Sequence, residues 1–186
     1  MKYMTNGAFR YKPLMRITLI ATLIFLSAFW VTTAVMYFSR MNLTPASVVA
    51  YYRGSEALFT QPRTFGTMLE VTHGHLPVMA LVALLLTHLF IFSGYSNRIK
   101  IAAVITLFAS AFLGEAASWL VRFVHPIFAW LKIASFISLE ISMAYLIWML
   151  FAMLLSGPPV FKVSHASKHD SGAISEDEPA GKSHHL

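Results

Sequence analysis

The sequence ITLIATLIFLSAFWVTTAVMYF occupies residues 17–38 and contains no charged side chain. A helix needs about 20 consecutive apolar residues to cross the hydrocarbon core of a bilayer, and this run is long enough. A cleavable signal peptide would have a shorter apolar run followed by small residues, whereas this run ends in bulky residues from Val35 to Phe38. We therefore predict a retained membrane-spanning helix.

Three further stretches predict helices of the same kind. The second predicted span covers residues 70–94, the third 100–121 and the fourth 126–155. Only 12% of the 186 residues are charged, whereas a soluble domain carries about a quarter. The sequence therefore predicts an all-α protein, an integral membrane four-helix bundle over residues 17–155, preceded by a cytoplasmic segment, residues 1–16.

The longest predicted connection, the outer loop 39–69, contains a segment with helix boundaries of its own. Pro45 suits the first turn of a helix and Gly54 suits its end, so we expect a short helix over residues 45–53 at the membrane surface. After the fourth span the composition changes to Gly, Pro, Ser, His and charged residues. Residues 156–186 are therefore predicted to form a disordered tail.

The distribution of basic residues predicts an orientation. Four spans place both termini on the same side of the membrane, and that side carries most of the Lys and Arg residues. Because basic residues favour the cytoplasmic side, both termini are predicted to be cytoplasmic in a multi-pass protein of the bacterial inner membrane. Lys132, near the start of the fourth span, is expected to extend back toward the outer surface.

Two features of the composition exclude classes of function. The chain has no cysteine, which excludes disulfides, thiolate zinc sites, iron–sulfur clusters and covalently attached haem in this polypeptide. A formal net charge of +6 would favour nucleic-acid binding in a soluble protein. Here the basic residues flank apolar segments, so we expect contacts with the lipid bilayer and no nucleic-acid partner.

Ionisable side chains within or beside the predicted spans are the candidates for function, because burying them in hydrocarbon is costly. Most are expected in the outer half of the membrane, whereas Glu140 is expected near the midplane and His88 toward the cytoplasm. The candidates are Glu70, His73, His75, His88, Glu115, His125 and Glu140.

A b-type haem or a metal ion is one interpretation of the outer cluster. A haem needs two neutral imidazoles from different helices at one depth, and His73 or His75 could meet His125 in this way. The same three histidines are the candidate metal ligands, with Glu70 or Glu115 hydrogen-bonded to a ligating imidazole. The alternative interpretation is that these histidines lie among the lipid headgroups, where water satisfies them, and bind no cofactor.

The remaining candidates also allow two interpretations. Glu140 and His88 could relay protons from the cytoplasmic half of the membrane. Otherwise His88 is a core histidine bonded to a neighbouring hydroxyl or carbonyl group, which is the interpretation we favour for it. Glu115 and Glu140 must be paired or protonated in hydrocarbon, and they could instead hold together helices of this bundle or of a partner.

The run from Arg63 to His75, RTFGTMLEVTHGH, resembles an uncharacterised family of small four-helix bacterial membrane proteins. Some members carry the label "elongation factor-1 alpha", but a translational GTPase needs a phosphate-binding G-x-x-x-x-G-K-S/T loop, which this chain lacks. The resemblance implies the four-helix fold and no particular activity. The chain is also loosely similar to four-helix b-type cytochromes that pass electrons between quinone and periplasmic partners, a similarity that implies haem binding.

Together these observations predict a redox-associated inner-membrane subunit. A haem b or metal ion near the outer face would pass electrons between quinone and an external partner, such as a membrane protein or a periplasmic cytochrome. The alternative is a cofactor-free membrane anchor or assembly subunit of a larger complex, or of a homo-oligomer. No enzyme activity is assigned by the sequence.

Overall fold

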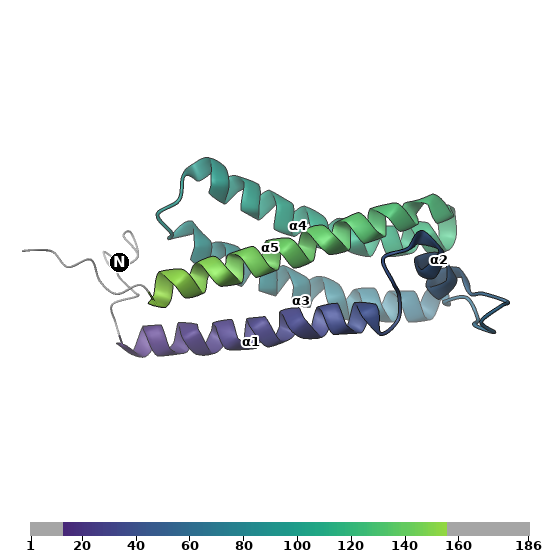
Figure 1. The fold of residues 1–186 in the computed structure, drawn as a ribbon, viewed down its shortest axis with the longest axis horizontal. Helices are drawn as coiled ribbons and strands as arrows, with labels where there is room; N and C mark the ends of the chain where they lie inside the picture. The colour runs from purple at the N-terminus through teal and green to yellow at the C-terminus, as the bar shows by residue number, and fades with distance from the viewer. Residues whose placement is uncertain (1–12, 156–186) are drawn as a thin grey trace, which may run out of the picture.

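The computed structural model describes residues 13–155, which form a bundle of long helices lying side by side (Figure 1). The long helices are α1 (Pro13–Phe38), α3 (Phe65–Ile91), α4 (Asn97–Trp119) and α5 (Ala129–Leu155); the short helix α2 (Pro45–Arg53) connects α1 to α3. A π-helical turn, Leu120–Val124, and a 3-10 turn, Pro126–Phe128, join α4 to α5. Within residues 13–155, four helices are long and apolar enough to cross a membrane, which confirms the predicted four-helix transmembrane bundle.

The helices begin and end within a few residues of the predicted spans. The largest difference is at α3, which begins at Phe65 rather than at residue 70. Thr64 caps this helix, because its side-chain oxygen accepts a hydrogen bond from the Thr67 amide at 3.2 Å. Glu70 interrupts the apolar run but lies exposed on the bundle surface, and an exposed polar side chain does not end a helix.

The short helix predicted within the outer loop is present as α2. Thr44 precedes Pro45 and caps the helix by accepting a hydrogen bond from the Ser47 amide at 3.4 Å. Gly54 ends the helix with φ 83°, a left-handed conformation that favours glycine. A Cβ atom at this position would also lie 2.6 Å from the Thr60 carbonyl oxygen, so a side chain does not fit there.

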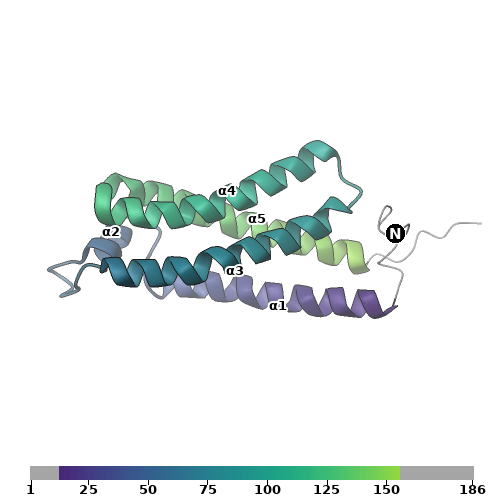
Figure 2. The same cartoon turned by 180° about the vertical axis from the view of Figure 1, so that it is seen from behind.

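The four long helices do not pack equally. α4 and α5 form a close antiparallel pair near α2 and diverge toward the other end of the bundle (Figures 1 and 2). α1 packs against α5, and α3 packs against both α4 and α5, whereas α1 and α3 make few contacts with each other. The fully buried core side chains include Leu23, Leu86, Phe90, Leu107, Met143 and Leu146.

Two arginine side chains fasten α2 and the following loop to the π-helical turn. The Arg53 guanidinium donates hydrogen bonds to the carbonyl oxygens of Val121, at 2.7 Å, and Val124, at 3.1 Å. Arg122 donates from Nε to the carbonyl oxygen of Arg63 at 2.6 Å. The Arg53 bonds occupy carbonyl groups at the end of the π-helical turn, and the Arg122 bond occupies a carbonyl group of the loop before α3. We call the end of the bundle that carries α2 the α2 end; the first residue of α1 and the last residue of α5 lie at the opposite end (Figure 1).

The predicted orientation places the α2 end outside the cytoplasm. Since the chain has no cysteine, single introduced thiols report topology without background. In intact cells, a membrane-impermeant maleimide is expected to label Glu56→Cys, at the α2 end, and to leave Ser96→Cys, at the opposite end, unlabelled until the cells are lysed. The reverse pattern would show that the basic residues do not set the orientation of this bundle.

Candidate ligand-binding cavity

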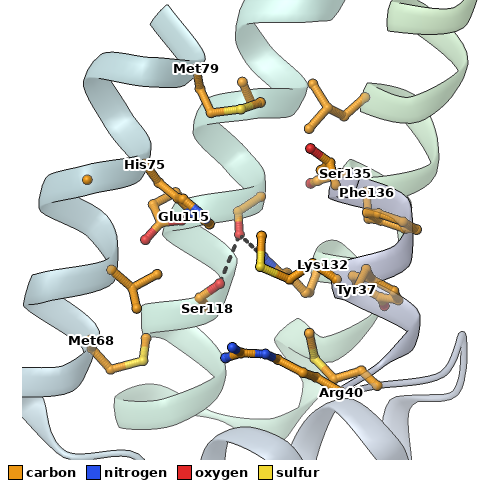
Figure 3. A pocket seen from close by; sticks show the side chains of 18 of the residues that line it. Tyr37, Arg40, Met68, His75, Met79, Glu115, Ser118, Lys132, Ser135 and Phe136 are labelled. Atoms are coloured by element: carbon orange, nitrogen blue, oxygen red, sulfur yellow. Dashed lines mark hydrogen bonds and ion pairs between the residues drawn. The ribbon is translucent and has the colours of Figure 1, made fainter. Parts of the chain in front are cut away.

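A cavity of about 330 Å³ lies between the helices in the half of the bundle nearer α2, a volume within the range of small-molecule sites (Figure 3). Side chains from α1, α2, α3, α4 and α5 line it, and most of its lining is apolar. Figure 3 shows Arg40 toward the α2 end, Lys132 and Glu115 further in, and Met79 beyond them. The apolar lining residues include Phe29, Met36, Met68, Val78, Met79 and Leu139.

Glu115 of α4 is held against α3 by two side chains. Thr72 donates a short hydrogen bond from its hydroxyl to Oε1 of Glu115, and the Nδ1 atom of His75 lies 3.6 Å from Oε2. The Thr72 hydroxyl in turn accepts a hydrogen bond from the Trp119 indole at 2.8 Å. Glu115 is only 13% exposed, whereas the His75 side chain is 50% exposed. The carboxylate therefore has partners within the bundle, and its hydrogen bonds join α3 to α4.

Lys132 points into the bundle rather than to its outer surface, so the expectation that it extends outward is wrong. Its ammonium donates a hydrogen bond to the carbonyl oxygen of Gly114 at 2.9 Å, where an apolar surrounding makes such a bond strong (Figure 3). The same carbonyl accepts a hydrogen bond from the Ser118 hydroxyl at 3.1 Å. Ser118 also bonds to the hydroxyl of Tyr52, at 2.9 Å, and burial raises the pKa of Tyr52. A continuous polar chain thus joins α5, α4 and α2.

Two more cations line the cavity near its α2 end, and both contact Tyr51. Arg40 donates from Nη1 to the Tyr51 hydroxyl at 2.9 Å. The guanidinium carbon of Arg63 lies 4.3 Å from the centre of the Tyr51 ring, a cation–π contact. Arg40 follows α1 and Arg63 precedes α3, so the two side chains reach the cavity from its two sides.

The histidines predicted as cofactor ligands are distributed over separate parts of the surface. His75 lines the cavity, whereas His73 and Glu70 are exposed and do not line it. His125 lies in an open groove beside α2 and Trp130, where its Nδ1 accepts a hydrogen bond from the Ile127 amide at 3.1 Å. In residues 13–155 no group of three His, Cys, Asp or Glu side chains is placed to hold a metal ion.

The two residues predicted as a proton relay differ in their surroundings. His88 lies exposed on the bundle surface, with its ring edge-on to Phe92, so the prediction of a core histidine is wrong. Both carboxyl oxygens of Glu140 are buried and lack a hydrogen-bond partner among the described residues. The Trp30 indole bonds to the backbone carbonyl of Glu140, at 3.2 Å, and not to its carboxyl group.

Sequence reasoning missed most of the polar lining of the cavity. Arg40, Arg63 and Thr72 are not among the candidates that the sequence indicates. One signal was available, because Thr72 lies three residues before His75 and therefore shares a helix face with it. No comparable pattern marks Lys132, because a lysine near the end of a span usually extends to the surface.

Comparison with known proteins identifies the domain but no relative of known activity. A family model described as a transmembrane helical domain matches residues 42–160, more than half of the chain, and the match begins after α1. No curated protein and no solved structure matches the chain.

The bonds around Thr72 predict a specific loss of stability. Thr72→Val keeps the shape of the side chain but removes both the donor to Glu115 and the acceptor for Trp119. We expect the free energy of unfolding to fall by about 1–3 kcal/mol, because a partly buried carboxylate loses a hydrogen bond. Thermal unfolding in detergent measures this loss, and Thr106→Val, at an exposed position of α4, is the matched control. Equal midpoints for the two variants would show that the Thr72 bonds contribute nothing.

Proposed function

The chain belongs to the Aq_1264_TM family of transmembrane helical domains, and from that premise we propose that it is a membrane-embedded binding subunit. Its ligand is an amphiphile, a molecule of the bilayer with a polar head and an apolar tail. In this proposal the protein lies in the bacterial inner membrane with its α2 end outward. The cavity then takes the ligand from the outer leaflet.

The main support for the proposal is that the cavity wall is polar near α2 and apolar further into the membrane. Near α2 its wall includes Arg40, Tyr51 and Arg63, and further into the membrane it includes Met79 and Leu139. An amphiphile of the outer leaflet has its head and its tail in the same order along the membrane normal. A cavity with polar groups at one end and apolar groups at the other can therefore hold such a molecule without removing its tail from an apolar surrounding.

The packing of the helices supports entry from the side. α1 and α3 line opposite walls of the cavity but make few contacts with each other. In this proposal a molecule in the bilayer reaches the cavity between these two helices, where little helix packing has to be disrupted, rather than through the polar α2 end. The part of the ligand that exceeds the volume of the cavity can remain between α1 and α3, in contact with lipid.

Gly74 offers a test that adds bulk to the cavity wall without a clash. It lines the cavity from α3, and a Cβ atom there meets nothing within 4 Å. Gly74→Phe is expected to reduce the amphiphile that copurifies with the protein by roughly fivefold or more, because overfilling a site costs about 1–3 kcal/mol. The measurement is mass spectrometry of extracts from the detergent-purified protein.

Gly94→Phe is the matched control, because this glycine also has open space around it but lies in the connection between α3 and α4, at the opposite end of the bundle. The control should retain the wild-type amount of amphiphile. If the two variants retain equal amounts, or if the wild type carries none after mild purification, the proposed function is wrong.

A second candidate function, a redox-associated subunit, is favoured by one contact. His75 lies beside Glu115, as a ligating imidazole lies beside a carboxylate that orients it. Met68 and Met79 line the same cavity, and a Met thioether paired with a His imidazole is a known axial ligand set for haem. In this alternative His75 binds a b-type haem or a metal ion, with a Met or another His as second ligand, and electrons pass between quinone and an external partner.

This alternative predicts a visible spectrum. The dithionite-reduced minus air-oxidised spectrum of the purified protein would show a sharp α-band, and His75→Ala would abolish it. His125→Ala would retain the band if a methionine is the second ligand and lose it if His125 is. A featureless spectrum together with no stoichiometric metal would contradict the redox alternative and would leave the amphiphile-binding subunit and the cofactor-free membrane anchor.

A further inference from the structure

The charges that line the cavity do not balance. Arg40, Arg63 and Lys132 contribute three positive charges, and Glu115 contributes the single negative one. A positive charge on His75 would only add to this, so the lining carries an excess of at least two positive charges. Arg63 and Lys132 are half-buried and Arg40 is exposed, so the cost of holding positive charge in a partly apolar surrounding falls on the first two.

None of the three cations is neutralised by an ion pair within residues 13–155. The only contact of ion-pair length among these residues, at 3.6 Å, lies between His75 and Glu115 and involves none of the three. Lys132 bonds to a neutral carbonyl oxygen, and its ammonium group has three donors, so two remain for a ligand. Arg40 bonds to a neutral hydroxyl, and Arg63 stacks on a ring.

Contacts with Tyr51 position the guanidinium groups of Arg40 and Arg63 before a ligand binds. Tyr51 contacts both guanidinium groups, one through its hydroxyl and one through its ring face. Each guanidinium retains N–H donors in a planar fork, which fits the oxygen atoms of a carboxylate or a phosphate. Because less side-chain freedom is lost on binding, such positioning increases affinity.

From these observations we infer that the cavity selects amphiphiles whose head is an oxyanion, a carboxylate or a phosphate, bound by Arg40, Arg63 and Lys132. This inference rests on the proposed function and names the class of its ligand. A neutral head such as an alcohol would leave the excess positive charge without a partner, and a cationic head would be repelled. The apolar wall beyond Lys132 then holds the start of the chain that the head carries.

Native mass spectrometry of the full chain, stripped of lipid in a non-ionic detergent, tests the inference with four probes. Dodecanoate and dodecyl phosphate carry an oxyanion, dodecanol has the same chain with a neutral head, and inorganic phosphate has no chain. We expect both anionic amphiphiles to bind at least about tenfold more tightly than dodecanol, since hydrogen bonds to a charged head are stronger than those to a neutral one. Binding of only one anionic amphiphile would also support the inference and would identify the head as that of a fatty acid or of a phosphate lipid.

Four variants, one of them a control, assign the selectivity to the named residues. Lys132→Met should reduce the preference for the anionic heads roughly tenfold while dodecanol still binds, and Lys132→Arg should restore most of it. Arg63→Gln, which leaves the backbone acceptor of Arg122 in place, should have an effect in the same direction. Arg98→Gln, at an exposed position near the opposite end, is the matched control and should bind like the wild type.

The outcomes separate the inference from the proposed function. If dodecanol binds as tightly as the anionic probes, the cavity holds amphiphiles but does not select an oxyanion, and the inference is wrong. If inorganic phosphate binds as tightly as dodecyl phosphate, the site takes free anions, which contradicts the inference. If no amphiphile binds at all, both the proposed function and the inference fail.

Discussion

The hydrogen bond from the Lys132 ammonium to the carbonyl oxygen of Gly114 joins α5 to α4 beside the cavity. Inside a membrane there is no bulk water to satisfy a polar group, so each one needs a partner within the protein. The Gly114 carbonyl oxygen provides a partner for two such groups, because it accepts a hydrogen bond from the Ser118 hydroxyl as well as from Lys132. The Ser118 hydroxyl is in turn bonded to the Tyr52 hydroxyl. Through these bonds the position of α2 depends on the pairing of α4 with α5.

The acidic and basic residues of the cavity attract each other through space, but each is hydrogen-bonded to a different partner. Glu115 is satisfied on the side of α3, by Thr72 and His75, and Lys132 is satisfied by a backbone carbonyl of α4. Each charge is therefore hydrogen-bonded without forming an ion pair with the other. This arrangement leaves the basic side of the cavity available to a ligand, whereas a direct pair would have neutralised it.

The number of spans and the short helix α2 could be predicted because they depend on local sequence. A long apolar run requires a helix in a bilayer, and Pro45 and Gly54 set the limits of α2 through their own backbone preferences. The direction in which a side chain points could not be predicted in the same way. Lipid and protein interior are both apolar, so the hydrophobic pattern does not distinguish the buried face of a membrane helix. For this reason the sequence favours a core position for His88, which the structure places on the surface.

The cavity is lined both by the matched domain and by α1, which precedes that domain. The matched domain, residues 42–160, carries Arg63, Glu115 and Lys132 together with apolar residues such as Met79 and Leu139, whereas Arg40 lies just before it. α1 precedes that domain and supplies an apolar wall, with Phe29 and Met36. Because α1 ends at Phe38, before Arg40, a chimaera that exchanges α1 alone would change one apolar wall and leave all three cations in place. The fit of the tail would then change on the side of α1 only, since Met79 of α3 and Leu139 of α5 still line the rest of the apolar part.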